Sequence, residues 1–500
     1  MIGYLVMAAW PIIVFWMFAR FNPATALGWA IIGGYLLLPE NISINLPAVP
    51  PIDKATVSAV AALVAAAVMV RPALERGRGQ GGQETTVLTG LLPRNRAVLL
   101  LIVLLFLGIA GTVATNGDTL RFVARQLPGL RLYDAGSLTL GAVSALLPFI
   151  MARKYMAAPE AQTRLLIVLA IAGLLYSLPA LYEVRMSPQL SRMIYGYFPH
   201  DWRQHIRAGG YRPVVFLPHG LWLAIFFSCS FLSALALWRM TSGRMAVRWL
   251  GASLWLLVTL VVAKGLGALA IGLMLGAATL FLPLRLRVLG AAVLAGAVLV
   301  YPMLRGADLV PTEQIIALAN DIDTARAESL TFRMVNEDIL LAKANERPLF
   351  GWGSWGRNRV FDEEGSDISV TDGYWVMAIG TKGWVGYLAE TGLLTLPLIL
   401  MAFRWRRLGL TPATAGIAVA LTANLIDLIP NATLTPVTWL MAGALAGRLE
   451  LGRAIPPAAP EPQGDGGEGA ALPVASNPYT RVPHRHPTRS MRGSTRRELS

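Results

Sequence analysis

Residues 97–115 have the sequence Ala-Val-Leu-Leu-Leu-Ile-Val-Leu-Leu-Phe-Leu-Gly-Ile-Ala-Gly-Thr-Val-Ala-Thr, which contains no charged side chain. A helix needs about 20 mainly apolar residues to cross the hydrocarbon core of a bilayer. The run has this length, so it predicts a membrane-spanning helix. The same kind of run recurs along the chain.

Hydrophobic residues make up 55% of the 500-residue chain and charged residues only 14%, a balance typical of membrane proteins. We expect an all-α, polytopic integral membrane protein. Its first segment is expected to be a retained span, because it lacks the basic start and cleavage site of a signal peptide. About 12–13 spans are expected, near residues 3–19, 24–39, 55–71, 97–115, 136–152, 165–184, 213–238, 249–263, 266–283, 288–304, 384–403, 411–430 and 436–449.

The net charge of +14 is distributed in a way that sets membrane topology. Basic residues gather in alternate connectors, at Arg71–Arg96, Arg153–Lys154, Arg239–Arg248, Arg285–Arg287 and Arg404–Arg407. The positive-inside rule makes these connectors cytoplasmic and the intervening loops external. This distribution argues against nucleic acid as a partner. The single cysteine, Cys229, lies within a candidate span, so an intrachain disulfide is excluded.

The polar segments divide the chain into four regions. Residues 1–303 hold spans with short loops and one longer external loop, 185–212, whose aromatic and arginine residues are typical of a segment at lipid headgroups. Residues 304–383 form one large external loop, and residues 384–453 hold the last spans. Residues 454–500 are rich in Pro, Gly and Ala and then in Arg, so we expect a disordered basic cytoplasmic tail.

The large external loop is expected to contain an arginine-bearing helix. Ser329 or Thr331 can cap a helix that runs to about Asn345. Pro348 ends it, because helical geometry is disfavoured at the residue before a proline.

A glycine-rich turn follows, Gly351-Trp-Gly-Ser-Trp-Gly356. It matches the dinucleotide-binding pattern in letters only, since that motif follows a strand and opens a helix, and here a proline-terminated helix precedes it. For Trp352 and Trp355 the alternatives are a place at the membrane interface, stacking on a sugar, or simple packing.

Four external cations are candidates for binding phosphate oxygens. A guanidinium group matches phosphate geometry with a fork of donors. Arg207 and Arg212 are therefore expected to contact either the phosphates of a substrate or lipid headgroups. Arg333 pairs either with phosphate or with Glu337, four residues further along the helix. Lys264 lies between two short apolar runs, where a charge is costly and indicates function, unless the lysine only snorkels at a helix end.

His219 lies at the external start of a span, as an acid–base group or, more commonly for histidine, as a packed and hydrogen-bonded side chain. The acidic residues between 362 and 367 fit no metal-ligand spacing and indicate a solvated loop. No zinc site, phosphate-binding loop or Ser/His/Asp arrangement is visible in the sequence. We therefore expect neither a metal nor a cofactor.

Three stretches resemble the superfamily of O-antigen ligases and Wzy-type polymerases, which are bacterial envelope glycosyltransferases. Arg333 followed by Glu346-Arg-Pro-Leu-Phe-Gly-Trp-Gly353 is similar to the family's arginine and "hPlfGvG" pattern. The stretch from Thr371 to Gly392 resembles its membrane re-entering segment, and Arg212-Pro-Val-Val-Phe-Leu-Pro-His-Gly220 resembles its shorter arginine-bearing loop. Lys264 stands where many members have the arginine of a Ser-Arg-Gly run. The likeness covers residues 165–430.

The resemblance implies an enzyme of the bacterial inner membrane that uses undecaprenyl-diphosphate-linked oligosaccharide as donor, at the periplasmic face. Cations must then stabilise the diphosphate leaving group, and the candidates are Arg212, Lys264 and Arg333. The acceptor hydroxyl needs a base. Family ligases carry a histidine just before the re-entering span, where this chain has Asp372, so either Asp372 or His219 is the base. This departure favours a polymerase of exopolysaccharide, capsule or O-antigen units.

Two alternatives stay open. An O-antigen ligase would transfer the glycan to lipid A-core or another acceptor. A transporter or flippase for lipid-linked glycan would show repeated halves and charges at mid-depth; neither pattern dominates here, which favours the enzyme. The expected partners are the lipid-linked glycan, its acceptor, the lipid bilayer and, for a polymerase, a chain-length regulator.

Overall fold

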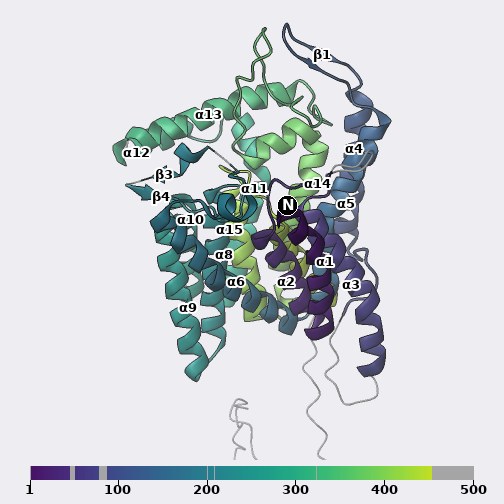
Figure 1. Ribbon diagram of the computed structural model, residues 1–500, viewed down its shortest axis with the longest axis vertical. Helices are drawn as coiled ribbons and strands as arrows, with labels where there is room; N and C mark the ends of the chain where they lie inside the picture. Colours follow the sequence, from purple (N-terminus) through teal and green to yellow (C-terminus); the bar gives the residue numbers. More distant parts are fainter. Residues whose placement is uncertain are drawn as a thin grey trace, which may run out of the picture. The chain divides into compact units, whose positions relative to one another are not determined.

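The computed structural model describes residues 2–44, 51–77, 87–199, 201–207, 209–322 and 324–452, so the predicted tail at 454–500 lies outside the described residues. Strands in the described part are confined to two hairpins, β1 (Leu120–Arg121) with β2 (Gln126–Leu127) and β3 (Ile206–Arg207) with β4 (Gly210–Tyr211). Nearly all other regular structure is helical (Figure 1). The prediction of an all-α fold is confirmed.

Each candidate span corresponds to one helix. They are α1 (Ile2–Arg20), α2 (Pro23–Leu37), α3 (Lys54–Gly77), α4 (Arg96–Thr115), α5 (Leu132–Tyr155), α6 (Pro159–Met186), α8 (Gly220–Met240), α9 (Gly243–Val262), α10 (Leu266–Phe281), α11 (Leu284–Gly306), α14 (Tyr374–Leu408), α15 (Pro412–Asp427) and α16 (Pro436–Leu451). In the described part of the chain, 8 helices are long and apolar enough to cross a membrane. Four more apolar helices are shorter: α2, α10, α15 and the Lys54–Val70 part of α3.

Burial within the bundle follows the expectation for a membrane protein. Helix α8 is enclosed by its neighbours along most of its length, with Phe227 and Leu232 buried. By contrast, α4 and α9 expose large apolar side chains, including Leu100, Leu107 and Val258. Exposed apolar surface of this extent is costly in water and favourable in lipid. The protein is therefore a membrane-embedded helical bundle.

The connectors gather at two opposite ends of the bundle. At the end that we call the loop end, Arg347 Nη1 donates to Thr115 O over 2.7 Å, Tyr195 Oη to Leu37 O over 2.6 Å, and Tyr374 N to Leu428 O over 3.1 Å. These bonds join the connectors 38–53, 116–131, 187–219, 307–373 and 428–435. At the other end, Arg153 pairs with Glu450 and Arg448 donates to Leu408 O.

Four further helical segments lie in the loop-end connectors: α7 (Leu190–Tyr195), the 3₁₀ helix η1 (Trp202–His205), α12 (Thr312–Ile322) and α13 (Thr324–Asn345). In Figure 1, α12 and α13 lie across this end of the bundle, above α10, α11 and α15. They are the helical part of the large loop of residues 307–373.

Several predicted boundaries are wrong, and three of them concern segments that carry candidate site residues. Helix α13 begins at Thr324 rather than at Ser329 or Thr331, although it ends at Asn345 as predicted. The span predicted from 213 begins only at Gly220, because the N-cap His219 is extended and Pro213 and Pro218 precede it. The span predicted from 384 already begins at Tyr374, because α14 continues through a break at Gly383.

The break in α14 is filled by the backbone of the large loop. Gly383 has φ +65° and ψ −174°, so the helical hydrogen bonds on either side of it are interrupted. The freed groups are paired with the loop: Trp352 N donates to Gly380 O over 2.8 Å, and Trp384 N donates to Pro348 O over 2.8 Å. Backbone groups inside a membrane protein must be satisfied internally. The turn at 348–353 therefore completes α14, and the two segments fold as one unit.

Candidate functional site

Arg333 is held at the loop end by groups from two other segments. Its Nε lies 3.5 Å from Asp372 Oδ2, and its Nη1 donates to Pro430 O over 3.2 Å and to Asn431 Oδ1 over 3.3 Å. Among the described residues its ion-pair partner is thus Asp372 rather than Glu337. Both side chains of the pair are about one-third exposed, at 31% and 32%. The guanidinium is fixed in position and yet reachable from solvent.

Glu337 lies one helical turn after Arg333 on α13, with a buried carboxyl group. Burial raises the pKa of Glu337 to about 7, while the nearby charge of Arg305 opposes part of that rise. A methyl group added to Gly373 would lie 3.1 Å from Glu337 Oε1, so the carboxyl group lies against the backbone next to Asp372. An acid that titrates near neutral pH is suited to proton transfer.

The connector after α15 is shaped by Asp427, which keeps Asn431 in place. Asn431 Nδ2 donates to Asp427 Oδ1 over 2.9 Å, and Thr433 Oγ1 donates to Asp427 Oδ2 over 2.7 Å. Asn424 Nδ2 in turn donates to Thr433 O over 3.4 Å. This chain of hydrogen bonds fixes the position of the amide oxygen that Arg333 uses.

Arg212 and Lys264 meet at the same loop end. Arg212 Nη2 donates to the carbonyl oxygen of Lys264 over 3.1 Å, and the Arg212 side chain packs over Gly220 at the start of α8. Lys264 occupies the turn between α9 and α10 with φ +56°, a conformation that is uncommon for residues other than glycine. Its Nζ lies against Gly210 of β4. The turn presents the lysine at the end of the bundle.

His219 caps α8. Its Nδ1 accepts a hydrogen bond from Leu221 N over 3.1 Å, and its ring is buried 4.8 Å from the ring centroid of His205. The neutral tautomer compatible with this cap carries its proton on Nε2. The structure thus places His219 in a packed, hydrogen-bonded position close to Trp222 of the same helix turn. Arg207 lies in β3 by its backbone, and its side chain is outside the described part of the chain.

The first turn of α8 lies beside Arg212 and also lines a small cavity. Gly220, which Arg212 covers, lies two residues before Trp222. Trp222 shares a cavity with Asn424 and Thr435. Asn424 belongs to the hydrogen-bond chain that ends at Asn431 and Arg333. Arg212 thus lies beside the helix turn that forms one wall of this cavity, and Arg333 is linked by hydrogen bonds to Asn424 on another wall.

The two tryptophans of the glycine-rich turn have different environments. Trp352 is buried: its Nε1 donates to Lys343 O over 2.7 Å, and Lys343 Nζ and Arg347 Cζ lie 3.7 Å and 4.1 Å from its ring centroid. Lys343 is ten residues from Arg333, or about 15 Å along α13. Trp355 is 55% exposed at φ +60°. Of the two rings, Trp355 is the one that a sugar can reach in this structure.

Asp118 fastens the large loop to the 116–131 connector. Its carboxylate receives both terminal nitrogens of Arg347, over 3.0 Å and 2.9 Å, and lies 3.4 Å from Arg357 Nη2. The hydrogen bonds from Arg347 hold the pKa of Asp118 below its ordinary range. Arg357 is almost completely buried and also donates to Asp118 O and Pro128 O. These ion pairs and hydrogen bonds hold Arg347 and Arg357, the residues on either side of the turn at 348–353.

Other acidic residues at the loop end serve the local structure. Glu183 accepts hydrogen bonds from Leu190 N, Val214 N and Val215 N, and Glu390 pairs with Lys382. In the 362–367 segment, Asp362 caps a turn and Asp367 pairs with Arg359. Among the described residues, no group of three or more His, Cys, Asp or Glu side chains could hold a metal ion.

No protein-family model matches the sequence, and no curated protein shows significant sequence similarity to it. The geometry of the loop end and the resemblance of the three stretches described above are therefore the features that bear on function.

The structure places Arg333 beside Asp372 and Arg212 beside Lys264, and a common site for the two pairs stays a prediction. Sequence reasoning missed the anchoring role of Asn431 and the burial of Glu337. It also missed Lys54 and Glu40, which form an ion pair at 2.5 Å. A signal for this pair was present, because Glu40, Asp53 and Lys54 are the only charged residues between the apolar runs 24–39 and 55–71.

Proposed function

We propose that the protein is a membrane glycosyltransferase that polymerises undecaprenyl-diphosphate-linked oligosaccharide units at the periplasmic face of the inner membrane. The observation that carries the proposal is the arrangement of the loop end, where Arg212 contacts Lys264 and where Arg333 is fixed by Asp372 and Asn431. Fixed cations are suited to stabilise the negative charge that develops on a diphosphate leaving group.

In the proposed reaction, the hydroxyl oxygen of the acceptor glycan attacks the anomeric carbon of the donor. The bond between that carbon and the diphosphate oxygen breaks, and undecaprenyl diphosphate leaves with the bonding electron pair. The hydroxyl proton passes to a carboxylate. Asp372 is the first candidate base because it is partly exposed beside Arg333, and Glu337 is the second because it titrates near neutral pH.

An O-antigen ligase is the close alternative within the same class. Polymerase and ligase share the donor and the leaving group, so the same cations serve both. The presence of Asp372, where family ligases carry a histidine, is the observation that favours a polymerase. His219 is the less suitable base, because its Nδ1 is engaged as the cap of α8.

A transporter of lipid-linked glycan is supported less well. Acidic residues of the spans that could line a transport path include Glu183, Glu390 and Asp427. Each is engaged by neighbouring groups at the loop end, Glu183 and Asp427 by connectors and Glu390 by Lys382. An intramembrane charge used for transport is expected to face a path rather than a structural partner.

Lipid analysis of a deletion strain separates the three functions. A polymerase predicts single lipid-linked repeat units in the outer leaflet. A ligase predicts full-length chains that fail to reach their final acceptor. Accumulation in the inner leaflet would overturn the enzyme proposal in favour of transport.

A further inference from the structure

A hollow opens at the loop end between α2, α3, α8 and the start of α16. It has a volume of about 620 Å³, including space open to solvent, and lies apart from Arg333 and Lys264. Its polar and aromatic lining consists mainly of Tyr35, Glu40, Asp53, Lys54, Trp222 and Thr435. We call it the Lys54 hollow.

The charged wall of the Lys54 hollow is rigid. Lys54 is buried, and its Nζ pairs with Glu40 Oε2 at 2.5 Å and donates to Tyr35 O over 3.1 Å. Asp53 Oδ1 accepts from Thr56 N over 2.8 Å at the start of α3. Two carboxylates and one ammonium leave one surplus negative charge. A diphosphate is therefore disfavoured here, whereas hydroxyl groups can donate to the carboxylates in strong, charge-assisted hydrogen bonds.

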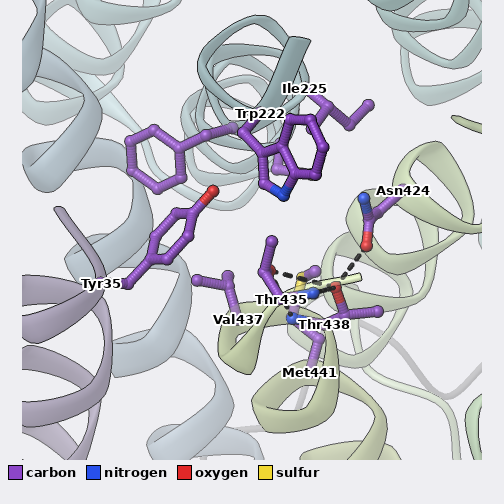
Figure 2. A pocket seen from close by; sticks show the side chains of 10 residues that line it. Tyr35, Trp222, Ile225, Asn424, Thr435, Val437, Thr438 and Met441 are labelled. Carbon is purple, nitrogen blue, oxygen red and sulfur yellow. Dashed lines mark hydrogen bonds between the residues drawn. The ribbon is translucent and has the colours of Figure 1, made fainter. Parts of the chain in front are cut away.

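A narrower cavity adjoins the hollow and shares Tyr35, Trp222 and Thr435 with it. Figure 2 shows this cavity, with the Tyr35 hydroxyl directed towards the Trp222 side and with Thr435 and Asn424 across from them. Tyr35 is 95% buried, at 5% exposure, and its Oη has no hydrogen-bond partner among the described residues. A buried polar atom of this kind costs about 1–3 kcal/mol unless a ligand or water satisfies it.

An indole ring, two fixed carboxylates and an unsatisfied hydroxyl together match the chemistry of a sugar. The apolar face of a pyranose can pack on Trp222, while its hydroxyl groups reach Glu40 and Asp53. We propose that the Lys54 hollow binds a neutral sugar unit at the end of the acceptor glycan; the acceptor role rests on the function proposed above.

The position of the hollow fits this role. Thr435 ends the 428–435 connector, in which Asn431 holds Arg333. The lining also includes Pro218, which directly precedes His219, and Lys54 Nζ donates to Phe216 O over 3.5 Å. A glycan seated in the hollow thus contacts both the segment that carries Arg212 and the connector that anchors Arg333.

The test is photo-crosslinking in cells that produce the native glycan. Benzoylphenylalanine replaces Ala55, which lines the hollow, in the full-length chain, and the adduct mass gives the composition of the bound molecule. The matched control carries the same residue at Val64, two and a half turns along α3 on its exposed apolar side. We expect a sugar adduct at position 55 and only lipid adducts at position 64.

A second variant tests the chemistry of the wall. Glu40→Gln with Asp53→Asn keeps a capping oxygen at the start of α3 but removes both negative charges. It is expected to lower the yield of the sugar adduct per molecule of protein in the membrane at least about tenfold. Only lipid adducts at position 55, no adduct there, or a yield insensitive to the double substitution would each overturn the proposal.

The outcomes also separate this inference from the proposed function. If Arg333→Ala loses product and position 55 gives no sugar adduct, the sugar-binding role of the hollow is wrong and the proposed function is unaffected. If position 55 gives a sugar adduct and Arg333→Ala still forms full product, the proposed diphosphate site and the acceptor role are wrong. The hollow then remains a glycan-binding site.

Discussion

The backbone of Gly351 packs directly against the backbone of Gly383, the residue at which α14 breaks. A methyl group on Gly351 would lie 2.5 Å from Gly383 N, and one on Gly383 would lie 2.3 Å from the carbonyl carbon of Leu349. Both glycines have positive φ, +67° and +65°. Arg333 lies before Gly351 and Asp372 lies shortly before Gly383, so the contact joins the two segments that carry this pair.

Gly383→Ala is expected to disrupt the large loop. A side chain is disfavoured at this φ by about 1–2 kcal/mol, and the overlap with Leu349 adds to that cost. We expect lower abundance in the membrane and faster proteolysis between 346 and 373, measured with protease added to spheroplasts. The matched control is Gly290→Ala in α11, where a methyl group would meet no atom within 4 Å. Equal protease resistance of both variants would contradict the account.

Arg333→Ala is expected to lower product formation by at least about 100-fold, the effect of removing one fixed group that stabilises transition-state charge. Membrane abundance should be unchanged, because the side chain is partly exposed. Glycan chains are measured on gels after silver staining. Arg359→Ala, which removes another arginine of the large loop, serves as the control and is expected to retain product. Wild-type glycan from Arg333→Ala would remove this residue from the site.

Lys264 separates the effect of charge from that of turn geometry. Lys264→Ala should lose activity, and Lys264→Arg should retain it, because both cations can face phosphate oxygens from the same turn. Lys264→Gly keeps the positive φ without the charge, so it should fold well and be inactive. Activity in the glycine variant would show that the turn matters and the ammonium does not.

The raised pKa of Glu337 predicts that the stability of the folded protein depends on pH. Because its pKa in the folded protein is raised from 4.5 to about 7, folding favours the protonated acid. Its contribution to stability is therefore fully present below pH 4.5 and is lost as pH rises through 7, by an amount on the order of 3 kcal/mol. Thermal unfolding in detergent at pH 5 and at pH 8 measures this. Glu337→Gln should weaken the dependence, and an identical dependence in wild type and variant would refute the assignment.

Asp118→Asn is expected to loosen the large loop. Arg347 loses its bidentate partner, and the buried Arg357 loses its counter-charge, which is costly for a desolvated guanidinium. Because the pKa of Asp118 is lowered in the folded protein, the stabilisation is present at neutral pH and is lost as pH falls below the ordinary value of 3.8. Hydrogen exchange of residues 347–357 at pH 7 should be faster in Asp118→Asn than in the control, Glu328→Gln.

Much of the fold could be predicted from the sequence, because span length and apolarity are local properties. The thirteen runs therefore correspond to helices, and the alternation of basic connectors agrees with the two ends of the bundle. The start of α14 was missed for a physical reason. Residues 374–382 are helical because they pack against Leu340, Leu341 and Ala344, and the break at Gly383 depends on a backbone segment about thirty residues earlier in the chain.

The candidate site could be predicted only in part. Residue type and the family resemblance led to Arg333 and Asp372, and the structure places them 3.5 Å apart. The partners of Arg333 in the 428–435 connector could not be predicted, since Asn431 is about a hundred residues away and has no motif. The same applies to the Lys54 hollow, whose residues come from four separate helices and meet only in the folded chain.

The most direct test of the central claim is release of undecaprenyl diphosphate by the purified protein in proteoliposomes with a lipid-linked glycan donor. The account predicts one undecaprenyl diphosphate released per glycosidic bond formed by the wild-type protein, and almost none by Arg333→Ala or Lys264→Ala. Glycan extension without release, or equal release by the wild type and both variants, would contradict it.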